Sequence, residues 1–346
     1  MTIYELDPLT DSRWPELLSW HPQASIFHTR EWLEALYRAY GYRPIAFTTS
    51  SGKDLANGMV FCQVQSWITG RRMVSVPFSD HCQPLAKSSE LQAILEYLQS
   101  HRKKKRFQYI ELRPLTLDGG VEQNTDFANS EKFSFQKIDL SPGTETIYRR
   151  FHDSCIRRKI KRAGRESLTY ESGRSDELLK KFRHLLLLTR RRHKLPPQPS
   201  SWFHNLAQCL GDRITFHLLS KDSIPVASIV TLTYEKTLTY KYGCSDAQFN
   251  NLGGTPDLFW KVIQQAKEVG VTDFDLGRSD YSDPGLIAFK EHLGAVTSEL
   301  RYYRNPAPGP KKESAKTETS FARQALSRLP DPLLAGAGEL LYRHLG

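Results

Sequence analysis

The sequence is poor in cysteine and has no long apolar run, and both absences narrow its class. Its five cysteines are scattered and contain no CxxC pair, which argues against a disulfide framework and against a zinc site. No stretch approaches the roughly 18 consecutive apolar residues that a membrane span needs. The opening residues MTIYELDPLTDSRWPELL lack the basic region and apolar segment of a signal peptide. We therefore expect a cytoplasmic protein that binds no metal.

Positive charge, by contrast, is in excess. The chain has 48 lysines and arginines against 38 acidic residues, a net charge of +10, which favours anionic partners such as phosphates, nucleic acid or an anionic membrane surface. Basic residues concentrate at 102–106, 148–165 and 190–194. No nucleic-acid-binding motif accompanies these runs, and a solvated helix face would explain each of them singly.

The pattern of apolar residues predicts an α+β protein with two halves of the same element order. Each half reads as a helix, several strands, a helix and a strand, which is typical of a mixed α/β architecture with two packed layers. In the second half we expect helices over 144–166 and 257–269. The length of 346 residues favours two domains, and we place them at 1–133 and 134–305, followed by a linker and an amphipathic C-terminal helix at 306–346.

The helix expected at 257–269 follows the segment GGTP. Thr255 can cap this helix, and Pro256 suits its first position. Gly253 and Gly254 would leave backbone N–H groups free at the helix N-terminus, where phosphates bind. A plain structural turn explains the same residues, so both interpretations stay open.

A second informative stretch is DFDLGRSDYSDPGLIAFKEHLG, residues 273–294. Asp275 ends an apolar strand, Arg278 follows in a polar loop, and Lys290 returns on a short helix. At the open end of a sheet, such a lysine can neutralise a phosphate or stabilise an oxyanion. The alternative is an ordinary surface lysine on a strand-to-helix connection.

The loop VPFSDHCQPL places Asp80, His81 and Cys82 next to one another. Adjacent residues project in different directions, whereas a nucleophilic triad needs side chains that converge in space. We therefore interpret the segment as a loop that lines a substrate site, or as a buried turn.

The last residues, SFARQALSRLPDPLLAGAGELLYRHLG, form an amphipathic pattern. Leu333, Leu334, Leu340, Leu341 and Leu345 can share one face, with Arg323, Arg328 and Arg343 elsewhere. Such a helix can lie on a membrane surface or pack back on its own domain, and the sequence does not favour one over the other.

Taken in order, five segments of the chain resemble the Fem-type (FemAB) branch of the GNAT acyltransferases, also described as BioF-like or CelD-like acetyltransferases. They are FHTREWLEALYRAYGY, PFSDHCQPL, IRRKIKRAGRE, RRRHKLPPQP and FDLGRSDYSDPGLIAFKEHLG. The resemblance runs from about residue 20 to residue 304. It implies two tandem GNAT-like domains, each with a mixed, mostly antiparallel sheet flanked by helices.

The resemblance also implies transfer of an acyl group to an amine or hydroxyl. Members linked to exopolysaccharide or envelope production are presumed to use acetyl-CoA or another acyl-CoA. The peptidoglycan branch takes aminoacyl groups from tRNA. We expect an acyl-CoA-dependent enzyme acting on a cell-envelope or exopolysaccharide precursor, in the cytoplasm or peripherally at the inner membrane face through the C-terminal helix.

By the same resemblance, the second domain carries the chemistry. Phe289 and Lys290 match a Phe-Lys pair of the peptidoglycan branch, whose lysine is associated with stabilising the transition state. Asp275 and His81 are the candidates for the general base. The remaining expected contacts are Gly253, Gly254 and Thr255 for donor phosphates, and Tyr242, Arg278, Asp80, His81 and Arg158 for substrate.

The chain departs from the family pattern in two ways. GNAT pyrophosphate loops read Q/R-x-x-G-x-G/A, but here Gln248 is followed by FNNLGGT, so the glycines come later. The long helical pair of some tRNA-using members is not evident between 144 and 200. The alternatives are an aminoacyl-tRNA-dependent transferase whose basic helix at 148–165 binds RNA, and a non-catalytic binding protein on a GNAT-like scaffold.

Overall fold

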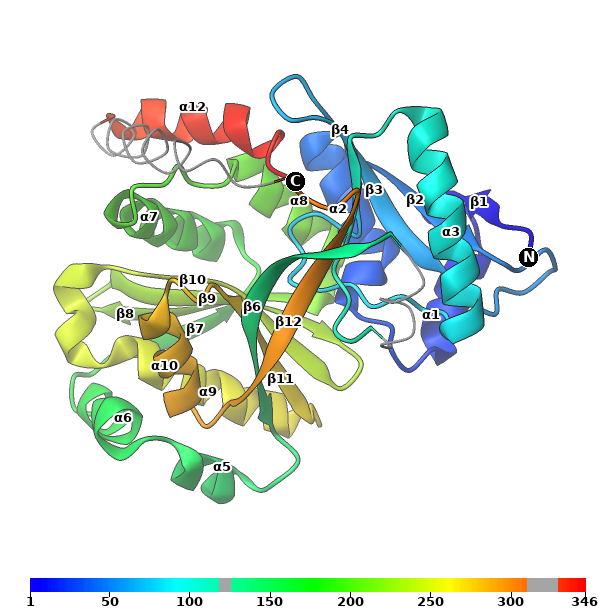
Figure 1. Cartoon of the computed structure of the whole chain (residues 1–346). Helices are drawn as coiled ribbons and strands as arrows, with labels where there is room; N and C mark the ends of the chain where they lie inside the picture. The colour runs from blue at the N-terminus through cyan, green and yellow to red at the C-terminus, as the bar shows by residue number, and fades with distance from the viewer. Residues whose placement is uncertain (118–125, 310–328) are drawn as a thin grey trace.

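The computed structural model describes residues 1–117, 126–309 and 329–346. Within these residues, twelve strands form a single sheet that runs through the whole molecule (Figure 1). The strands are β1 (Tyr4–Leu6), β2 (Arg43–Thr48), β3 (Met59–Ser66), β4 (Gly70–Val74), β5 (Tyr109–Leu112), β6 (Ala128–Asp139), β7 (Thr169–Gly173), β8 (Ile214–Lys221), β9 (Ile224–Tyr234), β10 (Thr237–Ser245), β11 (Asp273–Ser279) and β12 (Val296–Asn305).

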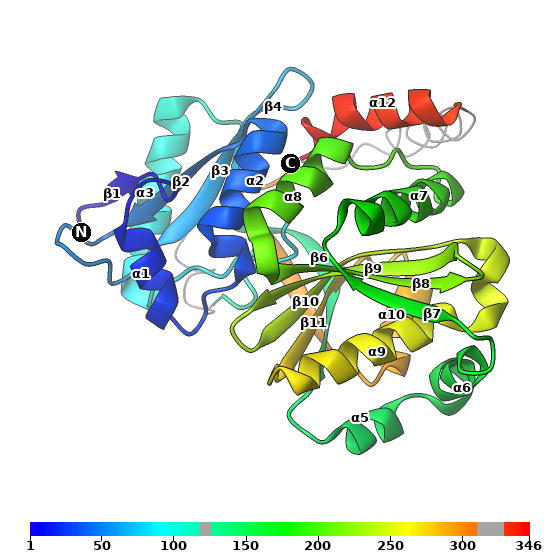
Figure 2. The ribbon, with the colours of Figure 1, turned by 180° about the vertical axis from the view of Figure 1, so that it is seen from behind.

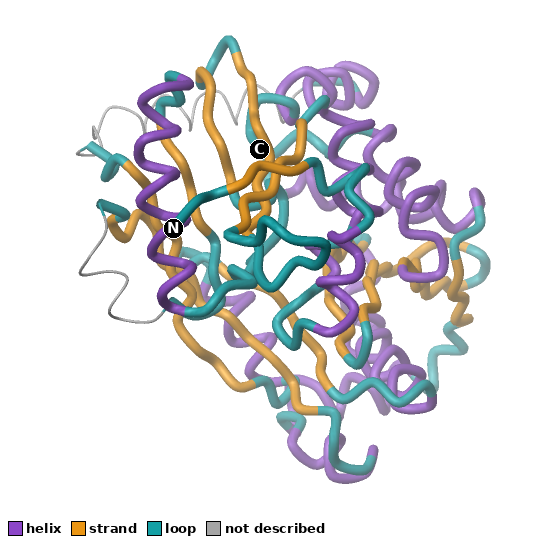
Figure 3. The backbone as a smooth tube through the Cα atoms, turned by 90° about the vertical axis from the view of Figure 1, so that its right-hand side faces the viewer, coloured by secondary structure: helices purple, strands orange, loops and turns teal. Residues whose placement is uncertain are grey.

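The helices flank this sheet on both faces (Figure 2). They are α1 (Arg13–Trp20), α2 (Arg30–Tyr40), α3 (Ser88–Lys105), α5 (Thr144–Arg150), α6 (Arg158–Ala163), α7 (Asp176–Arg192), α8 (Ser200–Leu210), α9 (Gly254–Glu268), α10 (Pro284–His292) and α12 (Asp331–Tyr342). Shorter turns are η1 (Ile26–His28), η2 (Asp153–Arg157), η3 (Gly211–Arg213) and η4 (Ala247–Leu252). Around β8–β10, α7 covers one face and α9 the other. The N-terminus lies beside α3 (Figure 1, Figure 3).

The strand order contains the same arrangement of antiparallel strands and one parallel pair twice. The order is β1-β2-β3-β4-β5-β12-β6-β11-β10-β9-β8-β7, and its neighbours are antiparallel except for β4 with β5 and β10 with β11. Each parallel pair is joined by a crossover helix, α3 in the first half and α9 in the second. The predicted α+β fold with two halves of similar arrangement is confirmed.

The two halves share a hydrophobic core. One cluster of buried side chains includes residues of α1 and α2 together with residues of α7 and α8, and Trp32 packs edge-to-face on Trp202 with ring centroids 5.4 Å apart. The predicted boundary after residue 133 falls within β6, which pairs with both β11 and β12. The boundary itself stays a prediction.

The helix expected over 144–166 is interrupted, and tertiary contact explains the break. The chain forms α5, then the π-helical turn η2, then α6. At the break, the backbone N–H of His152 donates to the carbonyl of His292 at 2.8 Å. A contact with such a distant segment is invisible to helical periodicity.

The C-terminal segment packs back on the protein. Leu334 and Gly338 of α12 are buried, and the guanidinium of Arg72 donates to the backbone oxygen of Gly346 at 2.7 Å. Leu333 and Leu340 stay exposed. Much of the expected linker, with Arg323 and Arg328, lies outside the described residues. No helix in the described ranges is long and apolar enough to cross a membrane.

Candidate active site

The candidate site lies where β10 and β11 separate. The two strands pair only from Thr237 to Thr239 and from Asp273 to Asp275. Beyond these residues β10 has an irregularity between Tyr240 and Tyr242, as expected of a β-bulge that bends a strand away from its neighbour. The backbone groups of β11 after Asp275 are therefore not paired with β10 and can form hydrogen bonds with side chains.

Lys290 fills part of this opening. Its side chain, on α10, is only 2% exposed, and its ammonium donates to the carbonyls of Gly277 and Arg278, each at 3.2 Å. An ammonium has three donors, so one N–H remains for a ligand. Burial lowers the pKa of Lys290 to about 8, against the opposing effect of Asp80 and Asp275. The interpretation as a surface lysine is wrong.

His81 and Asp275 form a buried pair beside Lys290. The Nε2 atom of His81 lies 2.7 Å from Oδ2 of Asp275, and Oδ1 of Asp275 accepts from the backbone N–H of Gly277 at 2.7 Å. The carboxylate is therefore held from both sides, and it fixes the orientation of the ring. The Nδ1 atom of His81 is buried and has no hydrogen-bond partner among the described residues.

Asp80 lies at the centre of a group of cations. Its Oδ2 is 3.1 Å from the ammonium of Lys241, and its Oδ1 is 3.8 Å from Nε of Arg278. Burial alone would raise the pKa of Asp80, but Lys241 and Arg278 outweigh it and the pKa is lowered. The loop that the sequence analysis singled out therefore brings a carboxylate of the first half to the β10–β11 opening.

Sequence reasoning missed Lys241. Its ammonium lies within 6.0 Å of the ring centroids of Phe27, Trp32 and Tyr242, a cation–π arrangement. The available signal was a single charge in the run TLTYKYGCS. The irregularity of β10 beside it could not be read from the alternation of side chains.

The loop that carries Asp80 and His81 has an unusual backbone. Val76 and Phe78 have positive φ angles of 55° and 59°, which is rare for a β-branched or bulky residue and is often found at functional sites. The hydroxyl of Tyr302 donates to the carbonyl of Asp80 at 2.6 Å. The loop is thereby tied to β12.

A cavity of about 380 Å³ opens at the N-terminus of α9, and we call it the α9 cavity. Its lining includes Lys159, Arg192, Tyr240, Thr255 and Phe289. Two cations and a helix N-terminus make it suited to a phosphate-bearing ligand. The residues present therefore fit the pyrophosphate of an acyl-CoA.

The glycines before α9 have a structural role at this cavity. Gly253 has a φ of +79°, and a Cβ atom there would come within 2.3 Å of the carbonyl oxygen of Lys159. Gly253 is also the residue that precedes the helix, and no side chain caps it. The expectation that Thr255 caps the helix is therefore wrong, because α9 begins at Gly254, two residues before the expected first position at Pro256, and Thr255 lines the cavity instead.

A second cavity, of about 340 Å³, is lined by His81 and Asp275 together with Ser25, Lys137 and Thr239. We call it the His81 cavity. Thr239 and Tyr240 are neighbours in β10, and neighbours in a strand point to opposite faces. Since Thr239 lines one cavity and Tyr240 the other, the two cavities approach the β10–β11 opening from opposite faces of the sheet.

Other expected substrate contacts lie outside these two cavities. The Tyr242 hydroxyl accepts from the indole N–H of Trp202 at 2.8 Å, and its ring packs on the first core cluster. The side chain of Arg158 is 73% exposed and pairs with Asp153. It is the next residue, Lys159, that lines the α9 cavity. Arg278 lies over the ring of Phe133, 4.1 Å from its centroid.

The region that contains this site matches a known protein family. The family model described as Acetyltransferase (GNAT) domain matches residues 150–291, a range that includes the β10–β11 opening, α9 and Lys290. No curated protein sequence matches the chain significantly.

Solved structures share the fold over almost the whole chain. FemX is 14% identical, with a TM-score of 0.70 over 93% of this chain and 100% of its own. A tandem GNAT protein from the clavulanic acid biosynthesis pathway is 10% identical, with a TM-score of 0.59 over 90% and 99%. The C-terminal domain of a putative lysylphosphatidylglycerol synthetase from Agrobacterium fabrum is 13% identical, with a TM-score of 0.55 over 91% and 95%.

Proposed function

We propose that this chain is an acyltransferase that uses acyl-CoA to acylate an amine or hydroxyl of a cell-envelope or exopolysaccharide precursor. The premise is that residues 150–291 match the model of a GNAT acetyltransferase domain and that 93% of the chain shares the fold of FemX. The observation that carries the proposal is the convergence of the Lys290 ammonium and the His81–Asp275 pair at the β10–β11 opening. Acyl-CoA supplies the activated acyl group.

The α9 cavity is the proposed donor site. Lys159 and Arg192 neutralise the donor phosphates, and the N-terminus of α9 adds the positive end of its helix dipole. Phe289 and Tyr240 line the same cavity and exclude water from the acyl arm. The carbonyl to be attacked then points into the opening between the strands.

The remaining N–H of Lys290 stabilises negative charge that develops on this carbonyl oxygen. Two of its donors are held by Gly277 and Arg278, so the third is positioned before substrate arrives. Donors fixed in advance in a buried site are the largest contribution to catalysis in many acyl transfers. Lys290 must be protonated for this role.

The acceptor enters from the opposite face, through the His81 cavity. Nδ1 of His81 takes the proton of the attacking amine or hydroxyl as the new bond to the acyl carbon forms and the bond to the donor sulfur breaks. Asp275 holds the ring in the tautomer with its proton on Nε2 and stabilises the charged ring. The proton then passes to the leaving thiolate.

Aminoacyl-tRNA is the alternative donor, supported by the fold of FemX and by the basic stretch that includes Arg158. RNA binding through such a stretch would weaken steeply as salt rises. The peptidoglycan precursor is then the acceptor.

A peripheral position at the inner membrane face is supported by exposed apolar side chains. Trp67 and Ile68, in the β3–β4 turn, are 86% and 50% exposed. The tail lies next to them, since the ring centroids of Trp67 and His344 are 5.4 Å apart. Leu340 and Leu345 of the tail are also exposed. A membrane contact here would bring the enzyme to a lipid-linked acceptor.

The test is thiol release from acetyl-CoA in the presence of amino sugars, sugar nucleotides or peptidoglycan precursors. We expect release that depends on one acceptor class, and a decrease of about 10²- to 10⁴-fold in kcat for His81→Ala. His204→Ala, at an exposed histidine of α8, is the matched control and should keep full activity. An unchanged kcat for His81→Ala would exclude the imidazole as the base.

A further inference from the structure

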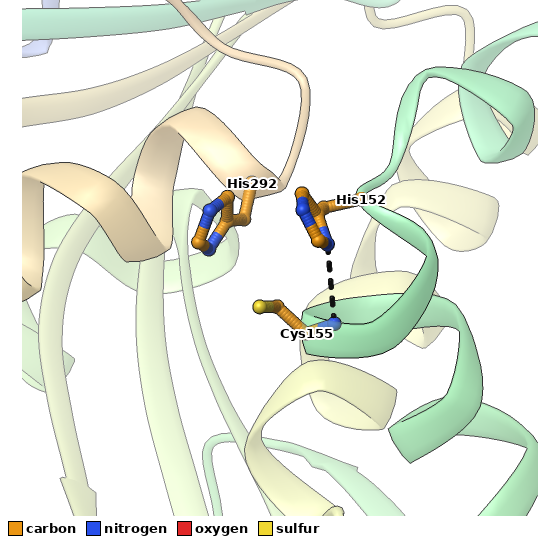
Figure 4. Close-up of side chains that lie close together, drawn as sticks. All are labelled: His152, Cys155 and His292. Atoms are coloured by element: carbon orange, nitrogen blue, oxygen red, sulfur yellow. Dashed lines mark hydrogen bonds between the residues drawn. The ribbon is translucent and has the colours of Figure 1, made fainter.

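Three potential metal ligands converge away from the β10–β11 opening. His152 precedes η2, Cys155 lies within it, and His292 ends α10. The ligand atoms of the three side chains all lie within 4.8 Å of one another. Figure 4 shows the two imidazole rings facing one another, with the sulfur beside the space between them.

The backbone brings the three residues together. The N–H of His152 donates to the carbonyl of His292 at 2.8 Å, and the ring centroids of the two histidines lie 4.4 Å apart. Gly294, with a φ of +77°, turns the chain so closely that an added Cβ would meet Cβ of Arg150 at 3.1 Å. The main chain therefore brings η2 and the end of α10 together, and the side-chain rotamers decide how closely the ligand atoms approach.

The donor set suits zinc. Imidazole nitrogen and thiolate sulfur bind Zn²⁺ at about 2.0–2.3 Å in tetrahedral geometry, so the ligand atoms need to close in by about 1 Å. Since His152 is exposed and the other two side chains are half-buried, they can rotate to do so. Nδ1 of His152 accepts a hydrogen bond from the backbone N–H of Cys155 at 3.3 Å, and ligation through this ring replaces that hydrogen bond.

The cluster lacks the oxygen ligands that a hard cation needs. The nearest carboxylate in sequence, Asp153, pairs with Arg157 and Arg158. This carboxylate is therefore already paired, whereas a hard cation such as Mg²⁺ needs several oxygen ligands.

We propose that His152, Cys155 and His292 bind one Zn²⁺ ion, with the fourth position left to water. The ion would join the π-helical turn η2 to the C-terminal end of α10, the helix that carries Lys290. The scattered cysteines predicted no metal site because the sequence separates His292 from the other two ligands, and only the fold unites them.

The test measures metal binding directly, so it needs neither a substrate nor acyl-transfer activity. The full-length chain without a histidine tag is titrated with Zn²⁺ by calorimetry and with Co²⁺ by absorption. We expect one ion per chain and a Co²⁺–thiolate charge-transfer band. Outer-shell partners alone are worth about 10- to 100-fold in metal affinity, so Cys155→Ser and His292→Ala should each weaken Zn²⁺ binding by at least about 100-fold and remove the band.

The matched controls are Cys209→Ser, at a half-buried free cysteine of α8, and His204→Ala, on the same helix. Both should bind Zn²⁺ as the unchanged protein does. No binding at micromolar Zn²⁺, or equal binding by Cys155→Ser and the unchanged protein, would overturn the proposal. Neither result depends on whether the protein transfers an acyl group.

Discussion

Lys290 is buried among backbone carbonyls, and its pKa of about 8 leaves it protonated at neutral pH, as its proposed role requires. Its burial is offset by two carbonyl contacts and by the nearby carboxylates of Asp80 and Asp275. Because burial lowers the pKa of Lys290, folding disfavours its charged form, and the charge itself adds little to the free energy of unfolding. A substitution of Lys290 should therefore reduce activity without reducing the stability of the fold.

Lys290→Met tests that separation. We expect kcat to decrease about 10²- to 10³-fold, the effect of removing one oxyanion donor, while donor affinity and the thermal midpoint stay the same or rise. Lys236→Met, at an exposed lysine in the β9–β10 turn, is the control. Steady-state kinetics and thermal unfolding measure both quantities, and unimpaired turnover would exclude the oxyanion role.

The pH dependence gives a second prediction. Because Lys290 acts as the protonated ammonium and its pKa is lowered to about 8, kcat should decrease as the pH rises through that value. Asp80 raises the pKa of Lys290 by its charge, so Asp80→Asn should move this alkaline limb to lower pH. A limb that stays in place, or moves to higher pH, in the variant would show that another group controls it.

At the scale of single elements, the sequence shows the signals that arise within one segment, but not the contacts between segments far apart in the chain. In α2, within the segment FHTREWLEALYRAYGY, the signals that begin and end the helix are local: Oγ1 of Thr29 accepts from the backbone N–H of Trp32, and Gly41 has the left-handed conformation at its end. The helix expected over 144–166 is broken, because its backbone meets His292. Likewise, a loop pattern can nominate His81, but only the fold shows that it meets Asp275.

The junction of α6 and α9 depends on Gly253. Gly253→Ala should destabilise the protein by more than the cost of about 1–2 kcal/mol for the left-handed conformation, because its Cβ would also meet the carbonyl of Lys159. Gly270→Ala is the matched control, since Gly270 has a similar φ of +77° and nothing within 4 Å of its Cβ position. Urea unfolding compares the two, and equal costs would contradict the close approach.

Across the whole molecule, the two halves cooperate in one site. The first half contributes Asp80 and His81, while the second contributes Lys241, Asp275 and Lys290. A shared core of α1, α2, α7 and α8 fixes their relation. The duplicated element order was readable from the sequence, but the placement of β12 between β5 and β6, which joins the halves into one sheet, was not.

The exposed apolar side chains of the β3–β4 turn and the C-terminal tail provide a prediction at the scale of the whole molecule. The protein should co-sediment with vesicles that contain anionic phospholipid, and Trp67→Ser should weaken this binding because an exposed indole anchors at a membrane interface. Trp20→Ser is the matched control, since Trp20 is 56% exposed on α1. Equal binding by both variants, or none by the unchanged protein, would contradict a membrane contact at the tail.

The most direct test of the central claim is thermal unfolding with acetyl-CoA, with free CoA and an unrelated nucleotide as controls. A ligand at a hundred times its Kd stabilises by about 2.7 kcal/mol, a shift of several degrees at most for a chain of this size. We expect that shift with CoA compounds and a smaller one in Arg192→Glu, which reverses a charge in the α9 cavity. No shift with any CoA compound, together with retention of aminoacyl-tRNA, would contradict the acyl-CoA assignment.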